Sequence, residues 1–398
     1  MKDIKIFWKE IIEEKVIKQL ENCMIEWSIW VLTADAHYGY SMPVGWCIAY
    51  ENHISLSWVG FDIGCGNKAV KTNILAKDID IKNYIQEIQK VIGFWVGRPN
   101  PNPIDHPVLE KINKSEFIPQ RWLLELASQQ LGTIGSWNHY VDIFVDRDWY
   151  IWVWVHFWSR GFWHKTTTWF IALSQGLKFH EHATEWSMDS KPILFDMSTQ
   201  IWQDYFYAMG IAWEYAYAWR DRVCDTVVSI LWWVITDEVH NHHNFAWKEN
   251  HFWKDYYVVR KWCTPAFDWQ RGFVWSNMFD KSFIIEWVDT QDSKEWLYST
   301  VHWAWRIMGR REAAWSWKKK WWVRTQVKEG KVDFEKTKQT AKERGVILVW
   351  AWADESPECY KELEEVLHYQ WDTVKITNRL NPILVMMAGA WEFDPYKD

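Results

Sequence analysis

Residues 60–66 read GFDIGCG and separate two runs of β-prone residues that together extend from about residue 46 to residue 75. Closely spaced glycines such as Gly60, Gly64 and Gly66 are typical of a turn and not of a strand interior. We therefore expect a turn between two strands, with Asp62 and Cys65 in the turn. Side chains held in such turns commonly form functional sites.

The rest of the chain mixes helical and β patterns. Apolar residues at helical spacing predict helices over residues 1–22, 78–93, 118–131, 198–224, 226–236, 334–344 and 357–368. β-prone runs predict a strand ending near Asp35, a hairpin of residues 139–146 and 149–156, and strands near 256–261, 282–288 and 346–350. His139 would begin one hairpin strand and His156 would end the other.

These elements do not alternate regularly, and no internal repeat or flexible linker is visible. The sequence therefore predicts a single α+β domain over residues 1–398, with mixed or antiparallel sheets and surrounding helices.

Composition narrows the function classes. About 48% of the 398 residues are hydrophobic, which is enough for a large core. The formal charge of −7 argues against a protein that coats nucleic acid through its overall charge. The basic run Lys318, Lys319, Lys320 and Arg324 could hold a phosphate backbone or be an ordinary solvated face.

Cellular location is predicted from cysteine usage and apolar runs. The six cysteines form no CxxC pair, the amino end lacks an apolar signal core, and no run is long enough to span a bilayer. We expect a cytoplasmic protein with reduced cysteines and no membrane segment.

Several side chains are of the types that bind transition metals: Asp62, Cys65, His139, His156 and the cluster His240, His242 and His243. Each also has an ordinary interpretation, because a buried cysteine is usually a small hydrophobic residue and 14 histidines make coincidences common.

The residues flanking these candidates form a series of short motifs. They are DAHYGYSMPVG at 35–45, GFDIGCG at 60–66, GSWNH at 135–139, HFWSRG at 156–161, HHN at 242–244, RKW at 260–262 and HWAWR at 302–306, followed by Arg310. In this order they resemble the motifs of the RtcB family of RNA ligases, from about residue 30 to the carboxyl end.

The resemblance implies GTP- and manganese-dependent joining of an RNA 3'-phosphate, or 2',3'-cyclic phosphate, to a 5'-hydroxyl, in tRNA splicing or RNA repair. His302 would take GMP from GTP and pass it to the RNA 3'-phosphate, and the 5'-hydroxyl would displace it. The implied partners are RNA, as tRNA halves or broken RNA, and an archease-like activator, with a monomer as the expected state.

The resemblance also assigns residues. Two manganese ions would be held by Asp62, Cys65, His139, His156 and His243, with Cys65 shared. His240, which also precedes an asparagine, remains the alternative to His243. Arg160, Arg306 and Arg310 would contact phosphates or RNA ends, and Asp35 would be an acid or base near the phosphate or a simple turn carboxylate. The nucleotide would contact Asn138, Asp142, Asn244, Ser276, Ser282, Trp303, Ala304, Trp305 and Lys397.

Tryptophan is abnormally frequent, with 37 residues against 17 glycines. Nine tryptophans stand where the resemblance leads us to expect glycine: Trp46, Trp58, Trp137, Trp158, Trp163, Trp262, Trp275, Trp303 and Trp305. An indole at such positions strains the backbone or obstructs a ligand. Our hypothesis is that UGA codons meaning glycine in the source are written as tryptophan.

Two other functions remain open. The same metal ligands could serve a two-metal phosphoesterase or nucleotidyl-transfer paralogue acting on another substrate. If the tryptophans are real, the chain could be an inactive RNA-binding relative.

Overall fold

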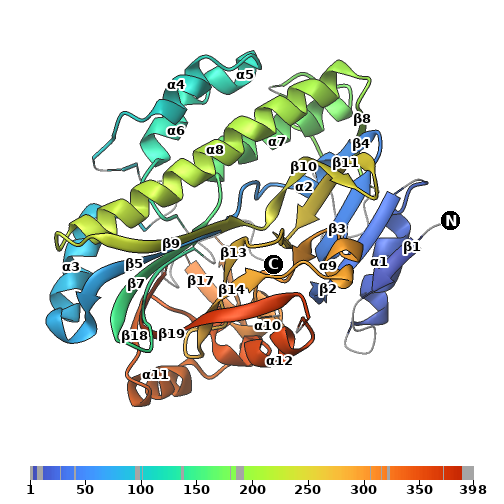
Figure 1. The fold of residues 1–398 in the computed structure, drawn as a ribbon. Coiled ribbons are helices and arrows are strands. Elements are labelled where there is room, and N and C mark those ends of the chain that lie inside the picture. The colour runs from blue at the N-terminus through green and yellow to red at the C-terminus, as the bar shows by residue number, and fades with distance from the viewer. Residues whose placement is uncertain are drawn as a thin grey trace.

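A computed structural model gives the fold (Figure 1). It describes residues 3–6, 12–26, 28–39, 42–94, 99–100, 102–135, 139–179, 181–184, 192–304, 306–314, 316–320, 323–370 and 372–387. Structural statements below concern these residues.

The longest sheet has the strand order β13-β14-β19-β6-β7-β5-β9, and β18 pairs with β19. The strands are β5 (Gly66–Leu75), β6 (Tyr140–Val145), β7 (Tyr150–Phe157), β9 (Ile235–His242), β13 (Arg271–Val274), β14 (Ser282–Trp287), β18 (Ile347–Val349) and β19 (Val374–Met387). All neighbours on the main path are antiparallel, whereas β18 is parallel to β19. The two end strands, β13 and β9, lie close together: Arg271 of β13 forms an ion pair with Asp237 of β9 at 2.8 Å. The sheet is therefore nearly closed.

A second sheet has the order β1-β2-β3-β11-β10. Its strands are β1 (Asp3–Ile6), β2 (Ser28–His37), β3 (Val44–Tyr50), β10 (Asn244–His251) and β11 (Lys254–Lys261). One residue, His243, separates β9 of the long sheet from β10 of this sheet. The chain therefore passes directly from one sheet to the other at His243.

Short strand pairs complete the β structure. They are β4 (His53–Ser55) with β8 (Leu194–Asp196), β12 (Thr264–Pro265) with β15 (Ser299–Thr300), and β16 (Ser316–Lys320) with β17 (Val323–Lys328).

Helices cover the sheets on two sides (Figure 1). The 30-residue α8 (Gln200–Ser229) crosses the long sheet, with α7 (Arg160–Ser174), α4 (Pro107–Asn113), α5 (Ile118–Arg121) and α6 (Leu124–Gln130) on the same side. The others are α1 (Glu14–Cys23), α2 (Leu56–Val59), α3 (Ile81–Val91), α9 (Gln291–Glu295), α10 (Arg310–Ala313), α11 (Phe334–Glu343), α12 (Leu363–His368) and the 3₁₀ turns η2 (Ala76–Asp78), η3 (Ala353–Glu355) and η4 (Pro357–Cys359).

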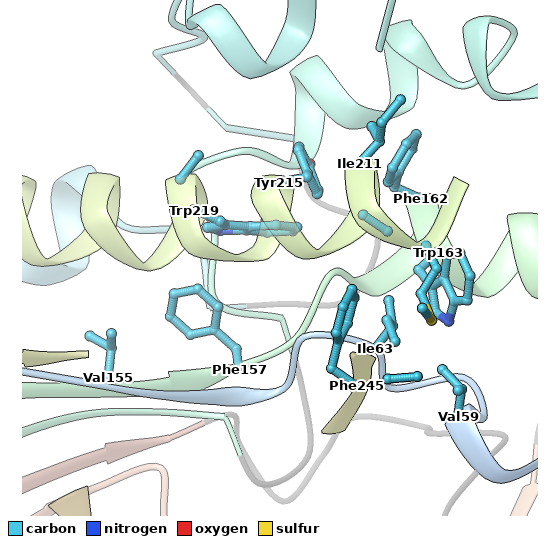
Figure 2. Close-up of a cluster of buried hydrophobic side chains, with 14 of the residues drawn as sticks. Val59, Ile63, Val155, Phe157, Phe162, Trp163, Ile211, Tyr215, Trp219 and Phe245 are labelled. Atoms are coloured by element: carbon cyan, nitrogen blue, oxygen red, sulfur yellow. The ribbon is translucent and has the colours of Figure 1, made fainter. Parts of the chain in front are cut away.

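The main core lies between α8 and the sheets (Figure 2). Trp219 of α8 lies against Phe157 of β7, with ring centroids 5.9 Å apart, whereas Tyr215 of the same helix lies against Phe162 of α7 at 5.1 Å, and all four side chains are buried. Burial of this apolar face holds α8 on the long sheet. A second buried cluster lies around β13, β14 and β19 with α11 and α12.

The α+β class with mixed and antiparallel sheets is confirmed, but several element boundaries were wrong. Residues 1–22 contain β1 before α1, and the helix expected over 226–236 ends with α8 at Ser229, before β9 begins at Ile235. The helix expected over 118–131 is split into α5 and α6, and only residues 363–368 of the last expected helix are α-helical. Strands β9, β10 and β19 went unpredicted. Polar residues alternate along β9 and along the first half of β19 and end β10, which weakens the apolar pattern; the apolar residues 383–387 at the end of β19 were simply not recognised as a strand.

Within the described ranges, no helix combines the length and apolar character needed to cross a membrane.

Candidate metal and histidine centre

The turn at residues 60–65 brings Cys65 to the start of β5. Gly60 and Gly64 both have φ near +70°, a conformation that favours glycine. At Gly66 the backbone of β9 passes so close that an added Cβ would lie 2.2 Å from the Asn241 carbonyl oxygen. Strand β5 pairs with β7 on one side and β9 on the other, so Cys65 meets residues from both neighbours.

Those residues are His156, near the end of β7, and His243, between the two sheets. The Cys65 Sγ lies 3.5 Å from His156 Nε2. The potential ligand atoms of Cys65, His156 and His243 all lie within 4.8 Å of one another, and the three residues are buried. One sulfur and two imidazole nitrogens form a donor set that suits a transition metal.

The protonation of the two histidines also suits metal binding, whereas the Cys65 thiol would have to lose its proton to bind a metal. The Nδ1 of His156 lies 2.8 Å from Asn67 Oδ1, so Nδ1 carries the proton and Nε2 presents its lone pair toward Cys65. Both ring nitrogens of His243 are buried without a hydrogen-bond partner in the described part of the chain. Burial lowers the pKa of both histidines well below the usual value and raises the pKa of the Cys65 thiol.

His240 and His242, which the sequence left as alternatives to His243, are engaged elsewhere. Arg220 Nε donates to His240 Nε2 at 2.9 Å, and the His240 Nδ1 lies 3.3 Å from Asp221. The two nitrogens of His242 lie 2.8 Å from the Tyr217 hydroxyl and 2.9 Å from the Trp247 indole nitrogen. Of these three histidines, only His243 has both nitrogens available.

Asp62 and His139, the other two expected ligands, lie outside this three-residue cluster. The Asp62 Oδ1 accepts hydrogen bonds from Lys261 Nζ at 2.5 Å and Asn244 Nδ2 at 2.8 Å. His139, directly before β6, bonds through Nδ1 to the Ile134 carbonyl oxygen at 2.9 Å. Its buried Nε2 has no partner among the described residues, so it is free to act as a ligand.

His302, the expected nucleophile, lies beside the cluster and is held by Asp35. The Asp35 Oδ2 is 2.7 Å from His302 Nδ1 and also accepts the His302 backbone N–H at 3.2 Å. The ring centroids of His302 and His243 are 4.7 Å apart. Asp35 is buried in β2 of the second sheet and its other oxygen lies 2.5 Å from the Thr33 hydroxyl. This arrangement places the His302 proton on Nδ1 and leaves Nε2 for chemistry.

The three expected arginines divide into two groups. Arg306 donates to the Tyr360 hydroxyl and the Asp354 carbonyl oxygen, each at 2.6 Å, and Arg310 pairs with Glu355. Arg160, at the start of α7, donates to the Thr133 hydroxyl at 3.2 Å. Its charge, like that of Arg310, lowers the pKa of His139, after the larger effect of burial. The basic run of residues 318–320 and 324 lies in the β16–β17 hairpin, and its side chains are outside the described part.

Most of the expected nucleotide contacts gather near Trp275. The Ala304 N–H donates to the Trp275 carbonyl oxygen at 3.1 Å, and the Ser276 N–H donates to the Ser282 hydroxyl at 3.4 Å. Asp142 is fully buried, which raises its carboxyl pKa well above the usual value. Asn244 instead bonds to Asp62, as described above. Asn138, Trp305 and Lys397 lie outside the described residues.

Indoles fill the space around the histidines. Trp262 stacks on His243 with ring centroids 5.3 Å apart and meets His302 edge-on at 5.2 Å. Trp303 meets His156 edge-on at 5.1 Å and contacts Trp275 at 4.3 Å. Three of the nine tryptophans that replace expected glycines therefore crowd the same centre.

Sequence reasoning missed two residues that orient this centre. Asn67 fixes the His156 ring, and Tyr360 together with η3 holds Arg306. Asn67 follows Cys65 by two positions, and strand alternation could have placed its side chain on the same face of β5. Tyr360 had no such signal, because its contact depends on the tertiary fold.

Comparison with known proteins agrees with this geometry. The family model described as "tRNA-splicing ligase RtcB" matches residues 19–117 and 110–388. The chain belongs to the RtcB family. It is 28% identical over 378 residues to the RNA-splicing ligase RtcB of Escherichia coli, covering 88% of each chain. It is 24% identical to the tRNA-splicing ligases RtcB of Pyrobaculum aerophilum and Methanococcus maripaludis, covering 90% of this chain and 87% and 88% of theirs. Membership in the RtcB family makes the protein a ligase.

Proposed function

We propose that this protein is a GTP- and manganese-dependent RNA ligase that joins a 3'-phosphate or 2',3'-cyclic phosphate end to a 5'-hydroxyl end. The observation that carries the proposal is the hydrogen bond of Asp35 to His302 Nδ1, which leaves Nε2 for chemistry in a ring whose centroid lies 4.7 Å from that of His243, a member of the Cys-His-His cluster. The relatives named as RNA-splicing or tRNA-splicing ligases supply the substrate class.

The first step is nucleotide transfer to His302. The Nε2 lone pair attacks the α-phosphorus of GTP, an N–P bond forms, and the bond to the β-phosphate oxygen breaks to release pyrophosphate. The imidazole becomes cationic as it attacks, and the buried Asp35 carboxylate on Nδ1 stabilises that charge. Asp35 is therefore a positioning and charge-stabilising residue for His302.

Two later displacements complete ligation. An oxygen of the RNA 3'-phosphate attacks the phosphorus on His302, which restores the neutral imidazole and links GMP to the RNA end. The 5'-hydroxyl oxygen of the second RNA then attacks the phosphorus of the 3'-phosphate, the new P–O bond forms, and GMP leaves with the hydroxyl proton. A 2',3'-cyclic end would first be opened by water to the 3'-phosphate and a 2'-hydroxyl. Arg160, Arg306 and Arg310, which the resemblance assigns to phosphates or RNA ends, would bind the phosphates.

The metal would be held by Cys65, His156 and His243, with His139 and Asp62 supplying further ligands. The unpartnered nitrogens of His243 and His139 support this fit, because buried polar atoms normally have partners. Bound manganese would offset negative charge on the phosphates. For Asp62 to contribute, its carboxylate would exchange its contact with Lys261 for the metal.

Labelled GTP tests the proposal. The chain is incubated with manganese and GTP labelled at the α-phosphate, and the denatured protein is examined for bound label. The printed chain and a chain with glycine at the nine positions named above are both assayed, because Trp262 and Trp303 contact the reactive histidines. We expect a covalent GMP adduct on the glycine chain, and its loss in His302→Ala.

The matched control is His368→Ala, since His368 is exposed at the end of α12 and should leave the adduct unchanged. Phosphate release without an adduct would overturn the proposal in favour of a phosphoesterase. RNA binding with neither product would favour an inactive RNA-binding relative.

A further inference from the structure

We propose that the residues at 149, 232, 253, 262, 269 and 350 are glycines in the protein that its source makes, encoded by UGA codons that the source reads as glycine. This inference comes from backbone geometry and does not depend on the proposed ligase function.

The backbone conformation at these positions is the first argument. Ten described residues other than glycine have positive φ, and six of them are tryptophan, with φ between 53° and 66°. Tryptophan makes up fewer than one residue in ten of the chain. None of the ten is asparagine or aspartate, the residues other than glycine that tolerate this conformation best. A bulky indole has no intrinsic preference that would explain the pattern.

Three helix ends provide an internal comparison. After α7, Leu177 N–H bonds to Ala172 O and Gly176 N–H bonds to Leu173 O. After α11, Val346 and Gly345 make the same two bonds to Ala341 and Lys342. These are Schellman caps, in which the residue with positive φ is usually glycine.

The third cap follows α8 and has the same bonds. Trp233 N–H bonds to Val228 O at 3.4 Å, and Trp232 N–H bonds to Ser229 O at 3.1 Å. Trp232 has φ of 58° and occupies the place that Gly176 and Gly345, each with φ of 73°, take in the other two caps. The same motif thus carries glycine twice and tryptophan once.

In three turns, tryptophan likewise occupies a position with positive φ that is typical of glycine. Phe252 and Trp253 form the two-residue loop between β10 and β11, both with positive φ, and the second residue of such a loop is typically glycine. In the β6–β7 hairpin, Trp149 N–H bonds to Asp146 O and has φ of 64°, the place of glycine in a bulged turn. Trp269 is the third residue of the turn closed by Gln270 N–H and Phe267 O, where positive φ again requires glycine.

Burial does not compensate for the strain at these turns. Trp253 is 99% exposed, Trp232 92% and Trp269 76%. Inside the protein, the indole N–H of Trp303 is buried without a partner among the described residues, although buried indole N–H groups usually have one. The exposed tryptophans gain no burial that would offset the strain, and the buried indole of Trp303 lacks a hydrogen bond within the described part of the chain, so neither environment favours tryptophan.

The experiment is peptide mass spectrometry of the protein purified from its source, read beside its gene. We expect glycine at all six positions, each lowering its peptide's mass by the difference between an indolylmethyl group and hydrogen, and UGA at each codon. Tryptophan at Trp232, Trp253 or Trp269, or UGG at their codons, would overturn the inference. The readout is independent of catalysis, so a failed ligase assay and a failed decoding hypothesis are distinguishable.

Discussion

The Nδ1 of His302 lies 2.7 Å from Oδ2 of Asp35, although the two residues are 267 positions apart in the chain. Asp35 belongs to the second sheet, and His302 follows β15 of a short strand pair. A buried carboxylate that accepts from both the ring and the backbone N–H of one histidine fixes the orientation of that ring.

Asp35→Asn should slow nucleotide transfer to His302. The amide keeps the shape of the carboxylate but cannot stabilise the imidazolium, so we expect a loss of on the order of 10²- to 10⁴-fold in the rate of adduct formation. The measurement is the time course of labelled GMP attachment at several pH values, because a merely structural defect would not alter the pH profile. Asp372→Asn, at an exposed position, is the control. An unchanged rate in Asp35→Asn would contradict the role.

Cys65→Ser should change the metal environment. The Cys65 sulfur lies within 4.8 Å of the ligand atoms of His156 and His243, so Co²⁺ bound there should show thiolate-to-metal charge-transfer absorption. We expect the band to disappear in Cys65→Ser and to persist in Cys23→Ser, whose thiol is buried at the end of α1 and has a pKa raised to about 12 by burial. The same band in both variants would exclude Cys65 as a ligand.

His164 should make the protein less stable in acid. Burial lowers its pKa to about 4 from the ordinary 6.5. The unfolded chain therefore binds a proton there that the folded chain does not, and stability present above about pH 6.5 is lost as the pH falls toward 4. Between pH 7.5 and pH 5 this residue should contribute a loss of about 2 kcal/mol.

Denaturant unfolding of His164→Phe at the same two pH values checks this. Phenylalanine keeps the stack on Phe61, whose ring centroid lies 4.7 Å away, and cannot titrate. We expect a smaller pH dependence than in the parent chain. Equal dependence in the two proteins would show that His164 is not the cause.

Trp253→Gly should stabilise the printed chain. Glycine removes the strain of positive φ at an exposed turn, which is worth about 1 kcal/mol. Thermal unfolding is the measurement, with Trp122→Gly as the control. Trp122 is also exposed, at 65%, but has φ of −67°, so glycine there should lower the melting temperature. A lower melting temperature in both variants would contradict the strain at Trp253.

The sequence was sufficient for those parts of the site that depend on local signals. The glycines around Asp62 and Cys65 predicted the turn, and the flanking motifs separated the candidate histidines from ordinary ones. It was not sufficient for β9 and β10, whose polar alternation resembles a loop until the strands find their partners. Strand pairing is a tertiary property, so local patterns report it weakly.

By itself, the sequence determined the α+β class, the set of sulfur, nitrogen and carboxylate groups, and the excess of tryptophan over glycine. Only the tertiary structure decided that His243 has free nitrogens while His240 and His242 do not, that Asp35 holds His302, and that Trp232 occupies a glycine position after α8. The physical reason is that composition and motif order are properties of the linear sequence and do not depend on folding. The availability of a lone pair and the sign of φ depend instead on neighbours that folding brings together from distant segments.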